Sequence, residues 1–455
     1  MNEHVEVANL RAMCIEVAEG DGERADRSDI LVVGRDIEFS TSDLESYATA
    51  NWDPVVYDAM VVAAAVEYCD RSLRRSSRFW ARQFAIKVPV HEPNRWKAPG
   101  VLNSLCDALR FLTGDIWSFE FVTRMQSVSK PRQGYLEIPS QTRATLAFSD
   151  GMDSRAVAGI VKAEYGHALV RVRLGSKRSD KPKKGEPFAA IPYKLKKKVQ
   201  NAEPSARNRG FRFALISGLA SYICKAKEII IPESGQGALG PVLIPVAHAY
   251  PDYRNHPAFL KRMERFIVAL LGHEVRYSFP RLWHTKGQTL KAYLDLTDSQ
   301  DEWAATRSCW KSARWSTVGG EFRQCGVCAA CMLRRLSVYA AGQSEPKGTY
   351  LAENLSAARL ADSVPASFDK VNKAFTQYAI AGVLHMDHLA DLATNDGQPV
   401  LRRNATDLAE VLGRTASETE ANITQMILQH SVEWRAFVAS LGGRSFVQNW
   451  VRGDR

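Results

Sequence analysis

The spacing of apolar and polar residues divides the chain into three regions. The first, residues 1–140, mixes short apolar runs with an amphipathic stretch near 54–73. The second, 141–340, alternates short apolar runs with helical patterns, which predicts parallel strands joined by crossover helices. The third, 341–455, consists of long amphipathic stretches without a strand pattern and is predicted to be helical. The apolar runs and helical patterns of the second region cover 144–149, 154–166, 168–175, 211–226 and 227–234.

This pattern predicts an α/β protein of two or three domains. A chain of 455 residues that is 45% apolar is long enough to bury a sizeable core. We expect a parallel-sheet domain at 141–340, an α+β region at 1–140 and a helical domain at 341–455. The helical domain would be a cap or a surface for a protein partner.

Composition narrows the class of protein. The chain contains no run of 18 apolar residues, and its first residues are too acidic for a signal or transit peptide, so we expect a cytoplasmic protein without a membrane span. Eight cysteines in so long a chain do not indicate a secreted disulfide scaffold.

The net charge of +10 has a local origin. Between Arg171 and Arg212 there are fourteen Lys and Arg against three Asp and Glu. A protein that coats nucleic acid would spread its basic residues, whereas a local surplus after a candidate phosphate loop also suits a small polyanion. A nucleic-acid partner is therefore an alternative that we do not favour, and a solvated loop is a third interpretation of residues 177–187.

Residues 144–154 (ATLAFSDGMDS) predict a strand, a tight turn and a helix. A helix that begins directly after a turn directs unpaired amides and the positive end of its dipole at one point, which suits phosphate. We expect Gly151 to adopt a backbone conformation closed to other residues. The loop resembles the S-G-G-x-D-S phosphate loop of ATP pyrophosphatases, with Asp150 where glycine is usual. A plain turn in which Asp and Ser cap the helix is the alternative.

Four cysteines are clustered between residues 309 and 331. Fifteen residues separate Cys309 from Cys325, and Cys328 and Cys331 follow at two-residue spacings. Four thiolates can close a tetrahedron around Zn²⁺, which predicts a structural zinc site in which Gly326 permits the tight turn between ligands. An iron–sulfur cluster is the alternative metal centre.

The loop and the cysteines together resemble the QueC family, the 7-cyano-7-deazaguanine synthases, over residues 142–340. SARN (205–208), ESGQGALG (233–240), YPDYR (250–254) and HTK (284–286) are similar to family motifs in the same order. The flanking regions also resemble the QatC group, the QueC-like components of Qat antiphage defence systems, at residues 70–96 and 111–115. Asp150, the long spacing after Cys309 and Tyr253 in place of a cysteine depart from the family pattern.

The resemblance implies a PP-loop (HUP-like) fold and an ATP-dependent ligase or synthase. Such an enzyme adenylates 7-carboxy-7-deazaguanine, with release of pyrophosphate, and couples it to an amine. The cofactors implied are ATP, Mg²⁺ and Zn²⁺. The catalytic residues implied are Ser149 and Asp153, the latter as an orienting group or magnesium ligand. The ATP-binding residues implied are Ser149, Asp150, Gly151, Met152, Asp153, Ser154, Arg207 and Asn208. The substrate-binding residues implied are Glu233, Gln236, Asp252 and Lys286.

Several alternatives stay open at this stage. The amine is either ammonia or an amine of a protein partner encoded in the same defence operon. A tRNA-modifying enzyme and a decayed nucleotide-binding scaffold are the rival functions. His385, His388 and Asp391 share a predicted helix face, for which we favour packing over metal binding. Trp80, Trp96, Phe111 and Trp117 are expected in a core rather than on a base-stacking platform.

Overall fold

The computed structural model describes residues 12–20, 29–39, 47, 53–75, 81–126, 141–174, 186–188, 191–200, 202–246, 250–296, 302–310 and 316–453. The chain divides into two compact units. The first unit comprises Met1–Ala147, Tyr165–Ile230 and Phe259–Ser278, and the second comprises Phe148–Glu164, Ile231–Ala258 and Phe279–Arg455. A division by contacts and a division by fold need not coincide, so the three domains expected from the sequence stay a prediction.

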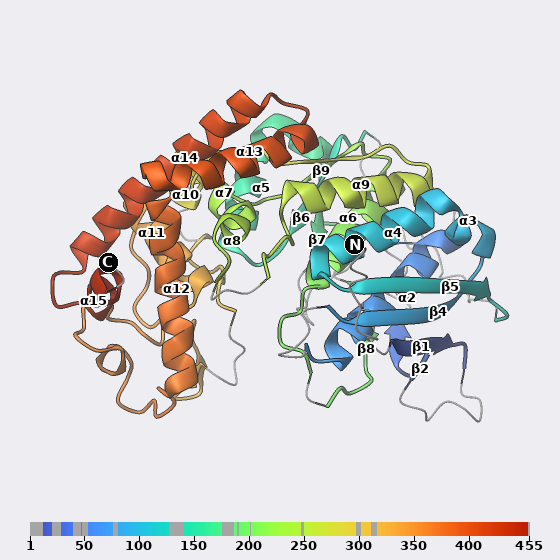
Figure 1. Cartoon of the computed structure of the whole chain (residues 1–455), viewed down its shortest axis with the longest axis horizontal. Coiled ribbons are helices and arrows are strands. Elements are labelled where there is room, and N and C mark those ends of the chain that lie inside the picture. Colours follow the sequence, from blue (N-terminus) through green and yellow to red (C-terminus); the bar gives the residue numbers. More distant parts are fainter. Residues whose placement is uncertain are drawn as a thin grey trace, which may run out of the picture. The chain divides into compact units, whose positions relative to one another are not determined.

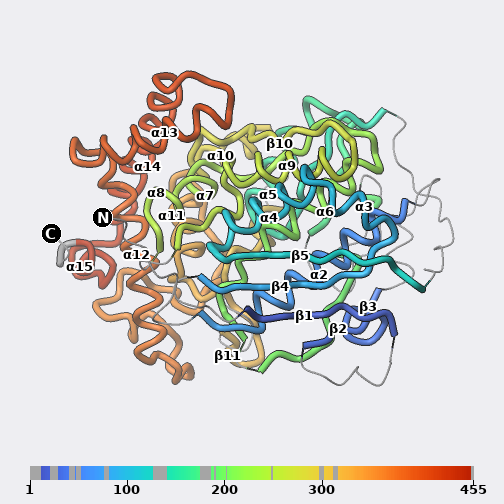
Figure 2. Tube along the Cα trace, turned by 45° about the vertical axis from the view of Figure 1, so that its right-hand side comes forward, coloured from blue at the N-terminus to red at the C-terminus, as the bar shows by residue number. Residues whose placement is uncertain are grey.

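One parallel sheet of the first unit has the strand order β2-β1-β4-β5 (Figure 2). Buried and partly buried residues alternate along most of β4, so one face of this strand lies in the core. α2 and α4 contact this sheet. β3 and β8 pair antiparallel beside it as a separate ribbon. The elements are β1 Met13–Ala18, β2 Ile30–Val32, β3 Ile37–Phe39, α2 Pro54–Ser72, β4 Gln83–Val90, α3 Pro93–Lys97, α4 Pro99–Thr113, β5 Ile116–Thr123 and β8 Tyr193–Leu195.

The second sheet has the order β10-β9-β6-β7. β6 is buried along its whole length, and it pairs parallel with β9, which pairs parallel with β10. The chain passes from β6 to its neighbour β7 and then returns to β9 on the other side of β6. In parallel α/β sheets ligands bind beyond the carboxyl ends of the strands at such a reversal. The elements are β6 Ala144–Phe148, α5 Met152–Tyr165, β7 Leu169–Arg173, α6 Arg209–Cys224, β9 Glu228–Ile230, α9 Pro257–Leu271 and β10 Arg276–Ser278.

The second unit is mainly helical. α11, α12, α14 and α15 contact one another around a single apolar core, and α13 lies along α14 (Figure 1). A two-stranded antiparallel ribbon, β11 with β12, precedes α11. The elements are α7 Gly235–Ala238, α8 Gly240–Leu243, α10 Lys286–Leu296, β11 Thr317–Val318, β12 Glu321–Phe322, α11 Ala329–Ala340, α12 Lys373–Asp391, α13 Gln398–Leu412, α14 Ala416–Ser440 and α15 Phe446–Gly453.

The predicted fold class is confirmed. The structure combines parallel sheets, helices, a four-cysteine cluster and a helical carboxyl-terminal part. Trp96 and Trp117 are buried, as expected of core residues, whereas Trp80 lies outside the described residues. His385 is buried on α12, and burial lowers its pKa to about 4, which agrees with packing rather than with a charged surface group.

In the described ranges, every helix is too short or too polar to cross a membrane.

Candidate functional site

The loop between β6 and α5 has the form of an anion cradle. α5 begins at Met152 immediately after the turn, so its first amides and the positive end of its dipole face the turn. The hydroxyls of Ser149 and Ser154 lie 2.8 Å apart, and the amide of Gly151 donates to the Ser149 hydroxyl at 3.3 Å. Two hydroxyls and the helix amides therefore converge on one turn.

Gly151 lies in a tight place, but not in the backbone conformation that we expected. Its φ lies outside the left-handed region, so the conformational prediction is wrong. A Cβ at this position would lie 3.3 Å from the Ser149 hydroxyl and 4.0 Å from the carbonyl oxygen of Arg307. A side chain would therefore crowd the turn in which the hydroxyls meet.

Asp153 and Lys286 form a buried ion pair at this turn. The Lys286 ammonium donates to one oxygen of the Asp153 carboxylate, and both side chains are less than one tenth exposed. The other carboxylate oxygen of Asp153 is buried and accepts from no nitrogen or hydroxyl donor within the described part of the chain, and the carboxyl group of Glu233 lies within hydrogen-bonding reach of the Asp153 carboxylate. Lys286 follows β10, and Asp153 follows β6, so the two come from the carboxyl ends of strands in one sheet. The structure brings together these two predicted residues.

Glu233, which follows β9, is the third member of this cluster. Burial, followed by the negative charge of Asp153, raises the pKa of Glu233 well above its ordinary value, and the charges of Lys286 and Arg254 offset part of the increase. The Asn255 amide donates to Glu233 at 2.8 Å. Lys286 thus pairs with Asp153 while its charge also acts on Glu233, and a protonated Glu233 can donate a hydrogen bond whereas the Asp153 carboxylate can only accept.

The carboxylate of Asp252 is paired with the guanidinium of Arg254. This carboxylate accepts two hydrogen bonds from Nε of Arg254, at 2.8 and 2.9 Å, and a further one from the same guanidinium. The Arg254 charge reaches Glu233, so this pair lies on the border of the cluster. A direct substrate contact of Asp252 stays a prediction.

Gln236 lies beneath the cluster and is only 2% exposed. Its side-chain oxygen accepts from the backbone amide of Lys286 at 2.7 Å, and its nitrogen lies 2.7 Å from Nδ1 of His430. Gln236 therefore contacts the segment that carries Lys286, and its predicted contact with substrate stays a prediction.

Arg207 and Asn208 belong to the first unit. Asn208 is 3% exposed, and both its backbone amide and its side-chain amide donate to Asp70, at 3.0 and 2.7 Å. This amide is held in a buried polar network with Arg82 and Asp115. An ATP contact of either residue stays a prediction.

The four predicted cysteines form a compact cluster in the second unit. Their sulfur atoms lie within 4.8 Å of one another, and 3.8 Å separates the sulfurs of Cys325 and Cys331. Tetrahedral Zn–S bonds of about 2.3 Å place sulfurs about 3.8 Å apart, so the donor set fits Zn²⁺. Hydrogen bonds with the other thiols, that with Cys325 first, lower the pKa of Cys309, which favours its thiolate.

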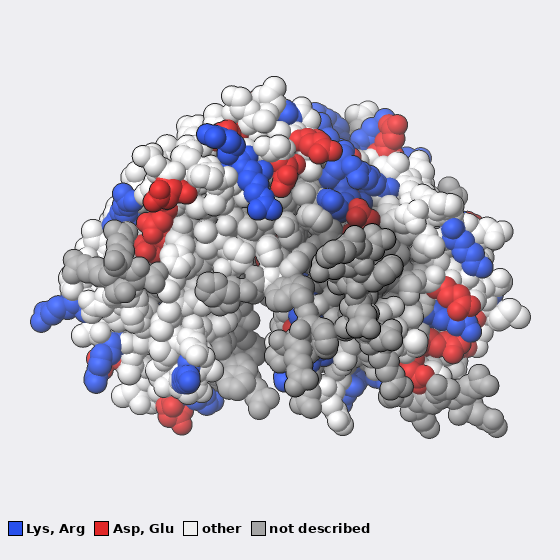
Figure 3. Space-filling view, in the orientation of Figure 1, with Lys and Arg blue, Asp and Glu red and all other residues white. Residues whose placement is uncertain are grey.

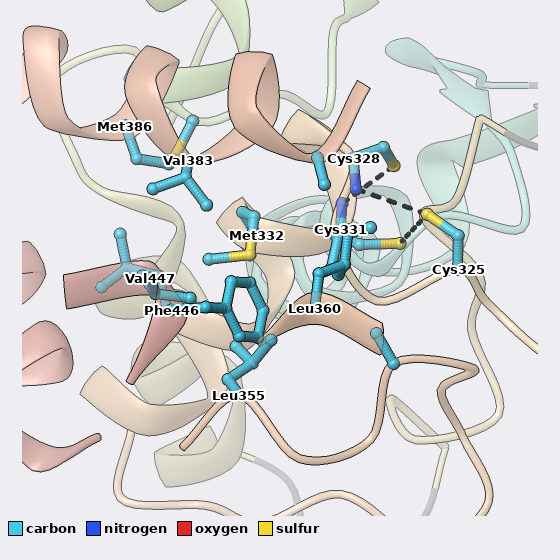
Figure 4. Close-up of a cluster of buried hydrophobic side chains, with 14 of the residues drawn as sticks. Cys325, Cys328, Cys331, Met332, Leu355, Leu360, Val383, Met386, Phe446 and Val447 are labelled. Atoms are coloured by element: carbon cyan, nitrogen blue, oxygen red, sulfur yellow. Dashed lines mark hydrogen bonds between the residues drawn. The ribbon is translucent and has the colours of Figure 1, made fainter. Parts of the chain in front are cut away.

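The tight turn between Cys325 and Cys328 has the geometry that the sequence predicts. Gly326 has a φ of +83°, and a Cβ there would lie 2.8 Å from the Ala352 carbonyl oxygen. The cysteines also form one end of an apolar core, in which Met332 lies towards Phe446 (Figure 4). A metal at this position would fix α11 against that core.

The cysteine cluster is connected to the phosphate loop. Arg307 lies two residues before Cys309 in the chain. Its backbone amide donates to the carbonyl oxygen of Asp150 at 3.0 Å. The side chain of Gln324 accepts from the amides of Ser308 and Cys309, at 2.8 and 3.2 Å. The sequence analysis did not identify this connection, because nothing in the spacing of the cysteines indicates that their first loop reaches the phosphate turn.

Most of the basic stretch cannot be assigned to a surface. Residues 175–185 lie outside the described residues. On the face in Figure 3, Lys and Arg are interspersed with Asp and Glu rather than gathered in one basic patch.

These features define an α/β protein with a phosphate-type loop and a four-thiol centre that fits zinc. Residues 245–342 match the family model described as QueC, Queuosine biosynthesis protein QueC. The match covers about a fifth of the chain and includes Asp252, Lys286 and the four cysteines, whereas the loop at 149–154 and Glu233 lie before it. No curated protein and no solved structure matches the chain.

Proposed function

We propose that this chain is a QueC-like cytoplasmic enzyme that uses ATP to adenylate 7-carboxy-7-deazaguanine, or a close analogue, and couples it to an amine. The single observation that carries the proposal is the cluster of Asp153, Lys286 and Glu233, which follow three strands of one parallel sheet and surround the turn before α5. The QueC-like segment at 245–342 supplies the substrate class.

The chemistry requires activation of an unreactive carboxylate. A substrate carboxylate oxygen attacks the α-phosphorus of ATP, the bond to the β-phosphate oxygen breaks, and pyrophosphate leaves. The amine then attacks the acyl carbon, loses a proton and displaces AMP, which forms a C–N bond. The α5 amides and the Lys286 ammonium would offset the charge of the departing pyrophosphate.

Asp153 and Glu233 suit two different tasks. The oxygen of Asp153 that does not accept from Lys286 would be a hard ligand for Mg²⁺, an ion that keeps several water ligands and binds phosphates when it accompanies ATP. A carboxyl group with a raised pKa, such as Glu233, can donate a hydrogen bond to an acceptor on a purine-like edge. Zn²⁺ at the four cysteines would hold the 302–309 segment against the loop and would take no part in the reaction.

The amine acceptor and the biological setting are part of the proposal. The helices of the second unit that follow residue 342 offer surface for a protein partner, whose amine would replace ammonia, in an antiphage defence system. Mass spectrometry of a co-expressed partner would then show a covalently added deazaguanine. A partner of unchanged mass, with free amide or nitrile as the product, would contradict this part alone.

Pyrophosphate release tests the central claim. We expect release from ATP and Mg²⁺ that depends on the added deazaguanine acid, and a rate about 100-fold to 1,000-fold lower in Asp153→Ala, because charge stabilisation at the loop is lost. Glu164→Ala, which removes an exposed carboxylate from the same helix, is the matched control. Parent protein that releases no pyrophosphate, or an Asp153→Ala variant that keeps the parental rate, would leave only a scaffold.

A further inference from the structure

The N-terminus of α10 is stabilised by hydrogen bonds between its own residues and by hydrogen bonds with residues of other helices. Thr285 precedes the helix, its hydroxyl accepts from the Gln288 amide at 3.1 Å, and the Gln288 side chain accepts from the Thr285 amide at 2.9 Å. This reciprocal pair is a capping box, which the T-x-x-Q spacing in the sequence indicates. Lys286 is the first residue of the helix, so the cap sets the starting point of its side chain.

One residue of α14 contacts this cap, and a second residue of the same helix holds the first. The Thr285 hydroxyl donates to Glu433 at 2.7 Å, and Gln429 donates to the same carboxyl oxygen at 2.9 Å. Glu433 is buried, and burial raises its pKa. Gly287 allows this close approach, since a Cβ there would lie 2.8 Å from the Ala340 side chain and 3.4 Å from the Glu433 carboxyl group.

His430 lies one turn earlier on α14 and belongs to a chain of hydrogen bonds that runs through Gln236 to the Lys286 amide. The protonation of its ring determines which group donates at each link of this chain. Nε2 of His430 lies 2.9 Å from the Met386 carbonyl, which can only accept, so Nε2 carries the proton. Burial lowers the pKa of His430 to about 4, so the ring is neutral and Nδ1 accepts. The Gln236 amide therefore donates to Nδ1, and the Gln236 oxygen accepts from the Lys286 amide.

We infer that α14 is a positioning element of the proposed ATP site, with His430 and Glu433 as the positioning residues that hold the N-terminus of α10 and thereby aim Lys286 at Asp153. The inference rests on the proposed function for its catalytic consequence. Neither residue contacts the loop directly: each acts through Gln236 or Thr285. The helical part of the chain would thus control the geometry of the site as well as any partner surface.

The position of Lys286 depends on these contacts because its ammonium is nearly buried. The side chain is 9% exposed and ends on the Asp153 carboxylate, which leaves little solvent to absorb a shift of the helix start. A displacement of about 1 Å at a positioning group lowers turnover by about 100-fold in enzymes. Loss of either α14 contact should therefore reduce kcat more than it weakens binding of ATP.

Two pairs of variants test the inference. We expect Glu433→Ala and His430→Ala to lower kcat for pyrophosphate release about 10-fold to 100-fold, with KM for ATP within about threefold of the parent. Glu433→Gln keeps the oxygen that accepts from Thr285, and His430→Asn keeps an acceptor near Nδ1, so both should recover most of kcat. Val432→Ala, at a position 66% exposed on the same helix, is the matched control and should equal the parent.

Amide hydrogen exchange separates this inference from the proposed function. In the full-length protein without nucleotide, peptides that span 285–296 should exchange faster in the two alanine variants and at the parental rate in Glu433→Gln and Val432→Ala. If the parent releases no pyrophosphate, the proposed function fails while the exchange result still decides whether α14 holds α10. Parental kcat and parental exchange in both alanine variants, or a loss of kcat that Glu433→Gln shares in full, would overturn the inference.

Discussion

Each unit places two carboxyl groups beside cationic side chains, and the two arrangements differ in how fully their carboxylate oxygens are hydrogen-bonded. In the first unit, Arg82 donates to Asp70 at 2.5 Å and to Asp115 at 2.6 Å, and its remaining nitrogen donates to backbone carbonyls. Arg75 and Asn208 satisfy the other carboxylate oxygens. All four carboxylate oxygens of Asp70 and Asp115 therefore accept hydrogen bonds, and we call this set the closed network.

The second unit presents the opposite case. Lys286 pairs with one oxygen of Asp153, the other oxygen accepts from no nitrogen donor within the described ranges, and burial, followed by the neighbouring Asp153 carboxylate, raises the pKa of Glu233. Buried polar groups in folded proteins are generally paired, so an incomplete set of partners marks a place where a ligand completes them. We therefore interpret the closed network as structural and the incomplete cluster as functional.

The largest expected effect concerns zinc at the four-cysteine cluster of the second unit, which the donor set fits. Cys331→Ser should lose zinc and lower the melting temperature of the second unit by about 10 °C or more, because a structural zinc site contributes its binding free energy to folding. Hydrogen exchange should accelerate in peptides of α11 and stay parental in peptides of β4. Cys106→Ser, at a cysteine outside the cluster, is the control and should keep the parental zinc content.

Uniform acceleration of exchange across both units would contradict this distinction. Full activity and full stability in a zinc-free protein would show that the four sulfurs do not need a metal.

The next largest effect tests whether the closed network is structural. Asp115→Asn should lower the free energy of unfolding by about 3–5 kcal/mol, because it leaves Arg82 and Arg75 with a weakened partner in a buried site. Urea denaturation of the full-length protein measures the change. The exposed Asp107→Asn variant on α4, in the same unit, is the control. A loss below about 1 kcal/mol would show that this network does not stabilise the first unit.

The sequence predicted the elements of the site better than their connections. The alternation of apolar runs and helical patterns predicted β6, α5 and parallel strands, and the cysteine spacing predicted the four-sulfur cluster, since both depend on local sequence. Lys286 and Glu233 were predicted only through a family resemblance. The structure places them beside Asp153.

The missed features depend on long-range packing. Arg307 reaches the loop, and His430 and Glu433 reach α10, from positions that no local pattern relates to the site. The capping box at 285–288 was readable as T-x-x-Q, but its link to α14 was not. Gly151 illustrates the same limit, because the structure shows close packing against Ser149 there and not the backbone angle that we predicted.

A smaller effect sharpens the contrast between the two carboxyl pairs. Asp153→Asn should cost about 1 kcal/mol or less, because Glu233 can ionise and become the partner of Lys286. Asp153→Asn combined with Glu233→Gln removes both candidate partners, so the double variant should lose about 1–3 kcal/mol more than the sum of the single changes. Urea denaturation of the four proteins gives this coupling energy, and strict additivity would mean that Glu233 does not replace Asp153.

The smallest effect is the pH dependence that Glu233 imposes on stability. Because burial and Asp153 raise the pKa of Glu233 in the folded protein, the unfolded chain releases this proton at a lower pH than the folded one. Its contribution to stability is therefore complete below the ordinary carboxyl pKa and is lost as the pH rises towards the raised value. Glu233→Gln should raise the melting temperature by a few degrees at pH 8, and this gain should shrink as the pH falls towards 4. The exposed Glu164→Gln variant is the control for the titration of surface carboxylates. A gain that is equal at pH 4 and pH 8 would mean that Glu233 is charged in the folded protein, and the incomplete cluster would then resemble the closed network in the first unit.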